Sequence, residues 1–178
     1  MRRLLQTLRL VPCARMVPHF IEPSLAQARM HLKTGDFSLL ESQLAQLSAE
    51  SYEGFVWRLA DDRQTPGWLK TWSRAMPQSP HPALLSAYVD ISNAWKVRGE
   101  TYVRDIPFLR RRRFPKIMNQ AYEKFLGIIE NDPGHAMALA GLIHCNVVIG
   151  AGDGHRDLWM DAAMLAQPFH CPVIVQYA

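Results

Sequence analysis

The chain of 178 residues is 48% hydrophobic and 20% charged, which is typical of a folded globular protein and excludes long intrinsic disorder. Its formal net charge of +4 arises in residues 1–21, which contain four arginines and no acid, so the neutral remainder argues against nucleic-acid binding. Cys13, Cys145 and Cys171 are far apart and lack CxxC spacing, which predicts neither a disulfide framework nor a zinc ribbon and favours a reducing compartment, the cytoplasm.

Two segments are expected along the chain. Residues 1–23 are predicted to form a basic leader, either poorly ordered or a short amphipathic helix. Residues 24–178 are predicted to form a single α-helical repeat-like domain. Its apolar tail at 173–177 indicates either packing back onto the domain or truncation of a longer protein. No apolar run reaches the roughly 18 residues that a membrane span needs.

Four helices are predicted before residue 77, each with one apolar face at helical spacing. Gly35 suits a left-handed C-cap and Asp36 the following N-cap, so the first two helices should form a hairpin. Thr65 is expected to cap the fourth helix, with Pro66 at its first position. The positions expected to be buried are Leu25, Ala28, Leu32, Phe37, Leu40, Leu44, Leu47, Tyr52, Phe55, Val56, Leu59, Leu69, Trp72 and Met76.

The second half continues with a helix over 83–98, a linker over 99–113 and a helix over 114–131. Two further helices are separated by a second Gly-Asp turn, at Gly152 and Asp153. The positions expected to be buried are Leu84, Tyr88, Ile91, Trp95, Met118, Tyr122, Phe125, Ile129, Ala136, Ala140, Ile143, Val147, Leu158, Ala162 and Leu165, with Trp159 a further candidate. Because no window shows sustained β alternation, we expect an all-α fold of antiparallel helical hairpins stacked as a short solenoid.

Three motifs carry a resemblance to known helical proteins. They are Gly35, Asp36 and Phe37 with Leu40, Glu41 and Leu44; Ala94, Trp95, Arg98, Gly99 and Tyr102; and Asn131, Asp132 and Pro133 with Gly152, Asp153 and Trp159. Through them, residues 24–168 resemble the tetratricopeptide-like helical repeat superfamily, and within it the bacterial family called domain of unknown function 4034. The resemblance implies a tetratricopeptide-like α fold in a bacterial protein and brings no known activity.

Trp95, Arg98 and Tyr102 lie at helical spacing around Gly99. If the helix continued past the glycine, they would form an aromatic and arginine patch able to anchor a peptide, since Trp, Tyr and Arg are enriched at binding hot spots. The preferred interpretation is structural: Trp95 continues the core face and Arg98 interacts with the helix C-terminus. The three residues remain the best candidate for partner binding.

The run Arg110, Arg111, Arg112 and Arg113 is the strongest local charge feature. Such a run can bind RNA, anionic lipid or an acidic protein. No glycine-rich loop or RNA-binding aromatic set accompanies it, so we interpret it as a solvated linker before a helix, and we keep the basic patch as a second candidate site.

The remaining reactive side chains are not predicted to form a site. Potential metal ligands lack metal-binding spacing, so neither metal nor cofactor is expected; they are His135, His144, Cys145, His155, His170 and Cys171. Asp153, Asp157 and Asp161 are spaced as the solvated face of a helix. No serine or cysteine has a recognisable catalytic partner, so the sequence predicts that the protein is not an enzyme.

The function expected is protein–protein interaction, with a peptide or a partner's helix bound on the concave face of the hairpins. Two alternatives remain open. One is an immunity- or chaperone-like binder dedicated to a single cognate partner, and the other is an enzyme with a site in the hairpin groove. The sequence leaves the partner's identity and the oligomeric state open.

Overall fold

The computed structural model describes residues 22–62, 65–99, 106–150 and 153–166. The predictions for the basic leader, for Tyr102, for Gly152 and for the C-terminal tail therefore concern residues outside these ranges. The described residues form eight helices and no strand, as the sequence predicts for an all-α fold. The helices are α2 (Glu22–Thr34), α3 (Phe37–Ala45), α4 (Ala49–Asp61), α5 (Thr65–Ala75), α6 (His81–Arg98), α7 (Phe108–Asn131), α8 (Ala136–Ile149) and α9 (Asp153–Ala166).

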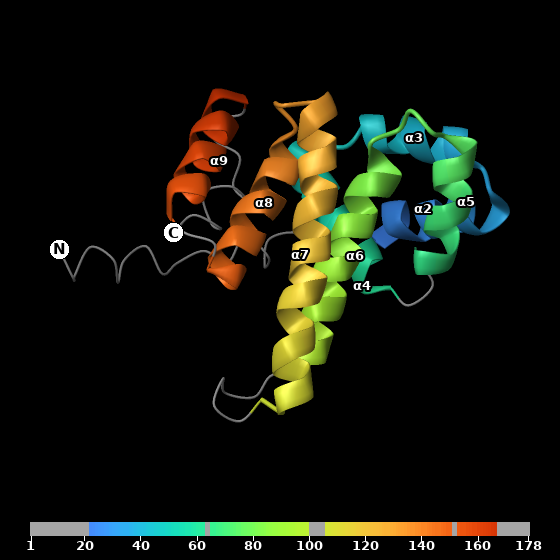
Figure 1. Cartoon of the computed structure of the whole chain (residues 1–178). Coiled ribbons are helices and arrows are strands. Elements are labelled where there is room, and N and C mark those ends of the chain that lie inside the picture. The colour runs from blue at the N-terminus through green and yellow to red at the C-terminus, as the bar shows by residue number, and fades with distance from the viewer. Residues whose placement is uncertain (1–21, 63–64, 100–105, 151–152, 167–178) are drawn as a thin grey trace, which may run out of the picture.

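The last four helices lie side by side in chain order (Figure 1). The most extensive packing is between α6 and α7, which form a long hairpin whose connecting end extends past the neighbouring helices (Figure 1). Helix α6 also contacts α4, α5 and α8, while α2 packs on α3. Helix α6 therefore joins the N-terminal helices to the α7–α9 row.

The first hairpin turns at Gly35, whose φ of 83° confirms the predicted left-handed cap. The backbone N–H groups of Gly35 and Asp36 both donate to the carbonyl of His31, 2.9 Å away in each case. Asp36 is the N-cap of α3, but its side chain does not bond to the helix; it accepts instead from the Thr34 hydroxyl at 2.5 Å. The turn is thus closed by backbone bonds and by one short side-chain bond.

Thr65 opens α5, as predicted, but its hydroxyl serves the preceding helix. It is fully buried and its Oγ1 donates to the carbonyl oxygen of Leu59 at 2.6 Å. That carbonyl belongs to the last turn of α4, where it also accepts from the backbone N–H of Asp62 at 3.1 Å. One hydroxyl therefore fixes the end of α4 against the start of α5.

Helix α7 begins at Phe108, six residues before the predicted start, so the linker assigned to Arg110–Arg113 is wrong. Pro107, which lies within the predicted linker, is the N-cap of α7 with φ −55° and ψ 141°. A proline just before a helix is compatible with it because its missing N–H would be unpaired there anyway, and arginine is a good helix former. The four arginines therefore occupy the first turns of a helix.

The C-terminal part corrects three burial predictions. The left-handed glycine that ends α8 is Gly150, with φ 73°. Val147 is half exposed, and Leu158 and Leu165 are 63% and 86% exposed. The face of α9 that packs on Leu139, Ala140 and Ile143 carries Trp159, Met160, Ala162 and Ala163. The alanines, which allow a close approach, face α8 in place of the leucines.

The predicted aromatic side chains are buried to different degrees, and Tyr52, Tyr122 and Trp159 are only partly buried against the core. Trp72, Tyr88 and Phe125 are buried. The Tyr88 hydroxyl donates to the carbonyl of Met137 in α8 at 2.9 Å, which satisfies the only polar atom of that side chain. Trp95 is 38% exposed, so the interpretation that it continues the core face of α6 is wrong.

Candidate functional site

An open groove of about 1050 Å³ lies between α5, the start of α6 and the end of α7. Apolar side chains on three elements line it, among them Leu69, Pro82 and Ile128. The turn before α6 supplies one wall through Pro77 and Pro80. Because prolines restrict the backbone, that wall is conformationally constrained.

The charged side chains that line this groove are three cations, Lys70, Arg74 and Lys124, and one acid, Asp132. Lys70 and Arg74 are exposed side chains of α5, and neither forms an ion pair with a described residue. Lys124 also lines the groove, but its Nζ is held by Asp90 Oδ2 at 2.5 Å and by Ser86 Oγ at 2.7 Å. The groove therefore has a mixed lining of apolar and polar side chains, and its α5 side carries two cations that form no ion pair with a described residue.

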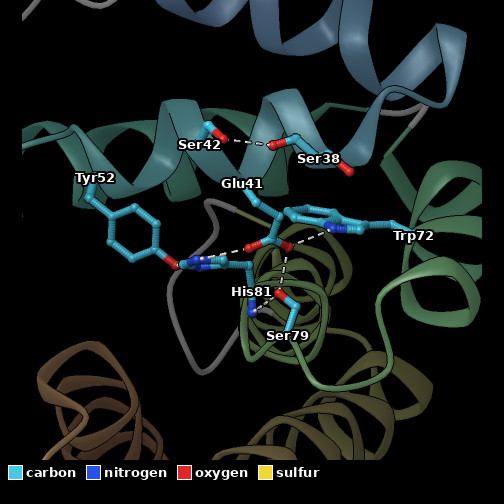
Figure 2. Close-up of polar contacts among 7 residues, drawn as sticks. All are labelled: Ser38, Glu41, Ser42, Tyr52, Trp72, Ser79 and His81. Carbon is cyan, nitrogen blue, oxygen red and sulfur yellow. Dashed lines mark hydrogen bonds and ion pairs between the residues drawn. The ribbon is translucent and has the colours of Figure 1, made fainter.

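A polar network lies beside this groove and links four helices (Figure 2). Its centre is Glu41 of α3, whose Oε1 accepts from Trp72 Nε1 at 2.9 Å and from Ser79 Oγ at 2.6 Å. The other oxygen, Oε2, faces His81 Nε2 at 3.4 Å. The second ring nitrogen of His81, Nδ1, lies 2.6 Å from the Tyr52 hydroxyl. The network thus connects α3, α4 and α5 to the first residue of α6.

The protonation states follow from burial. Desolvation lowers the pKa of His81; the Glu41 charge opposes this shift and His135 adds to it. Desolvation also raises the pKa of Tyr52, with the Glu41 charge adding to the effect. A neutral His81 then directs its Nε2–H to Glu41 and accepts at Nδ1 from the Tyr52 hydroxyl, a tautomer assigned from these partners.

This arrangement uses its hydrogen-bonding groups internally. Both nitrogens of His81 and both oxygens of Glu41 face protein partners. The raised pKa of Tyr52 keeps it a hydrogen-bond donor rather than a phenolate. Chemically, the network is suited to holding four helices in register, and it fixes the turn at Ser79 that forms one wall of the groove.

None of these residues is predicted from the sequence to form a polar site. Tyr52 and Trp72 were expected only as apolar positions, and Glu41 only as part of a motif. Glu41 lies 31 positions from Trp72 and 38 positions from Ser79 in the sequence. Contacts at such separations leave no short-range pattern in the sequence. The clue available was a polar residue, Glu41, adjacent to the apolar face of α3.

The two predicted binding patches meet at one place, the connecting end of the α6–α7 hairpin. We call residues 95–99 and 106–114 the hairpin tip. Helix α6 ends at Arg98, and Gly99 follows with φ 74°, so the helix does not continue towards Tyr102. Arg98 Cζ lies 5.2 Å from the centroid of the Trp95 ring, and its Nη1 donates to the Gly99 carbonyl at 3.2 Å.

Trp95 also ties α6 to its neighbours. Its ring lies edge-on to Phe114 of α7 with centroids 5.3 Å apart, and its Nε1 donates to His144 Nε2 of α8 at 3.2 Å. Arg110 of the basic run approaches Gly99 across the hairpin. The candidate residues Trp95 and Arg98 therefore share the hairpin tip with Arg110–Arg113.

The other reactive side chains are dispersed. His135 is the N-cap of α8, where its Nδ1 accepts from the Ala138 N–H at 3.4 Å. Burial raises the pKa of the Cys145 thiol to about 12. Asp157 and Asp161 lie on the exposed side of α9. Within the described ranges, no three His, Cys, Asp or Glu side chains gather where they could hold a metal ion.

Comparison with known proteins adds no assignment. No model of a protein family matches the chain, and neither a curated protein nor a solved structure matches it significantly. Among the helices described above, none is both long and apolar enough to cross a membrane.

Proposed function

We propose that this protein is an interaction module that binds a peptide or a partner's helix in the groove between α5, α6 and α7. The observation that carries the proposal is the groove itself, an open hollow of about 1050 Å³ with apolar side chains from three helices. Ligand sites are typically concave and largely apolar, with a few polar groups that fix orientation. An open groove bounded by helices suits an extended segment or an amphipathic helix.

The charge of the groove specifies the partner's chemistry. Lys70 and Arg74 stand at the α5 side without ion-pair partners among the described residues. A bound segment with an acidic side chain next to small apolar ones would pair with these cations while it covers Leu69 and Ile128. Such complementarity contributes to selectivity and to the association rate.

We infer a tetratricopeptide-like arrangement in which this groove is the concave face, in a bacterial and cytoplasmic protein related to the domain of unknown function 4034. The motif around Gly35 and the buried free thiol of Cys145 support this inference. We also infer a non-enzymatic role. Its support is that Glu41, His81 and Tyr52 direct their polar atoms to one another.

The experiment is a selection of peptides by display on the immobilised full chain, followed by affinity measurements. Peptides enriched in acidic residues are expected. The double change Lys70→Glu with Arg74→Glu should lower the affinity for these peptides about tenfold. The matched control is Lys33→Glu with Arg58→Glu, two exposed cations outside the groove, which should leave the affinity unchanged. Equal weakening by both pairs would contradict a site in the groove.

A dedicated immunity- or chaperone-like binder is the alternative form of the same function. Purification from the native host distinguishes the two. A single stoichiometric partner whose binding is lost with the groove variant indicates a dedicated binder, and a mixed set of partners indicates a scaffold.

A further inference from the structure

The hairpin tip exposes two large apolar side chains at the outermost part of the fold. Phe108 and Leu109, the first two residues of α7, are 67% and 78% exposed. They lie at the end of the α6–α7 hairpin that extends beyond the neighbouring helices (Figure 1). Placing such side chains in water costs free energy that a partner surface would recover.

Cations surround this apolar pair. Within residues 95–99 and 106–114 the charged side chains are all positive; they are Lys96, Arg98, Arg110, Arg111, Arg112 and Arg113. Lys96 is paired with Asp61 of α4 at 2.7 Å, which leaves the arginines as the charge of the tip. All four arginines of the run are exposed. Glu100 and Asp105 belong to the intervening segment outside the described residues.

We propose that the hairpin tip docks on the surface of an anionic lipid bilayer. Phe108 and Leu109 enter the boundary between headgroups and acyl chains, and the arginines contact lipid phosphates. Basic residues next to exposed Phe and Leu are the pattern by which peripheral segments bind anionic membranes. Each arginine near such a surface strengthens binding about fivefold, and its long side chain reaches the phosphates from the sides of the tip.

The shape of the tip favours a bilayer over a protein or RNA. A protruding end can meet a flat surface without contact from the rest of the fold, whereas a protein partner would need a matching pocket. RNA is held at exposed aromatic faces on which bases stack. At the tip an arginine already covers one face of each ring, because Arg112 Cζ lies 5.5 Å from the centroid of Phe108 and Arg98 Cζ lies 5.2 Å from that of Trp95.

Cosedimentation with phosphatidylcholine vesicles, with and without phosphatidylserine, tests the proposal on the full chain. Binding is expected only with phosphatidylserine and should fall as salt is raised. Phe108→Ser with Leu109→Ser should lower the partition coefficient about tenfold. Arg112→Glu with Arg113→Glu should lower it at least as much. Leu39→Ser, at an exposed leucine of α3, is the matched control and should have no effect.

The arginines of residues 1–21 require a second control. A full chain with Arg2, Arg3, Arg9 and Arg15 changed to Gln should retain binding that depends on the tip. The proposal is overturned if anionic vesicles do not bind the native chain, or if the serine variants bind as well as the native chain. It is overturned also if the arginine variants lose binding to an RNA oligonucleotide or to polyglutamate while vesicle binding is unaffected. Circular dichroism verifies that each variant is folded.

Discussion

Gly141 of α8 lies against the outer end of the Phe125 ring of α7, so closely that a Cβ at position 141 would be 2.3 Å from Phe125 Cζ. Both residues are buried. Gly141→Ala should therefore separate α7 from α8 or displace the ring, and we expect a loss of about 3 kcal/mol in the free energy of unfolding. Urea unfolding followed by circular dichroism measures it.

The matched control is Gly127→Ala on α7, where a Cβ would meet nothing within 4 Å. There the helix propensity of alanine should raise stability by about 0.5–1 kcal/mol. Opposite signs for the two glycines are expected. A stabilising effect at Gly141 would contradict the close approach to Phe125.

Thr65→Val removes the bond from Oγ1 to the Leu59 carbonyl at nearly constant volume. The carbonyl keeps its bond from the Asp62 N–H at 3.1 Å, so only the Thr65 bond is lost and we expect a loss of about 1 kcal/mol in unfolding free energy. Ser42→Ala removes a comparable bond, from Oγ to the Ser38 carbonyl at 3.0 Å, on the exposed side of α3 (Figure 2). That control should change stability by less than about 0.5 kcal/mol.

Tyr52→Phe removes the hydroxyl that donates a hydrogen bond to His81 Nδ1. The nitrogen remains partly buried without a donor, which should cost about 1–2 kcal/mol in the free energy of unfolding. Glu41→Gln should cost more than this, because an amide oxygen that keeps the Trp72 and Ser79 donors leaves its NH2 group facing the Nε2–H of His81, where two donors meet. Equal stability of all three proteins in urea would show that the network contributes nothing.

The stability should fall in mild acid. Burial lowers the pKa of His81 and of His135 in the folded chain below the ordinary 6.5. The unfolded chain then binds more protons, so this contribution is complete above pH 6.5 and is lost as the pH falls through 6.5 towards the folded-state values. His135→Asn keeps an N-cap acceptor for α8 and should make the decline shallower. An unchanged slope in urea titrations at several pH values would disprove a role for His135.

Cys145 should be unreactive in the folded protein. Burial raises the pKa of its thiol to about 12, and only the thiolate attacks disulfide reagents. In a chain carrying Cys13→Ser and Cys171→Ser, labelling at about pH 8 should require unfolding and should follow the global unfolding rate. Immediate labelling of the folded chain, read by absorbance of the released thiolate, would contradict this burial.

Local patterns predicted the helices well because the apolar residues of each buried face recur at helical spacing. Gly35 and the buried faces of α3 and α4 are examples. The patterns failed where the neighbouring helix determines which side chains are buried. Leu165 fits an apolar face, yet α8 accepts the alanines of α9 instead. Trp95 is in register with Ile91, but it lies near the end of α6, where its ring packs at the edge against Phe114.

The candidate sites likewise differ in how far the sequence could predict them. Trp95, Arg98 and the arginine run were visible because each is compact in sequence, although only the structure brings them to one hairpin tip. The groove and the Glu41 network depend on side chains from separate helices. The packing of helices that are far apart in the sequence brings these side chains together, and helical periodicity predicts only which face of each helix is buried.

The bond between Tyr88 and Met137 bears on the order in which the chain acquires its structure during synthesis. The acceptor is added 49 residues after the donor, so α6 leaves the ribosome with a core hydroxyl that has no final partner. The four-helix network around Glu41 is complete once Ser79 and His81 have emerged. The N-terminal helices of a nascent chain can therefore pack together early, while one side of α6 has no packing partner until α8 has been synthesised.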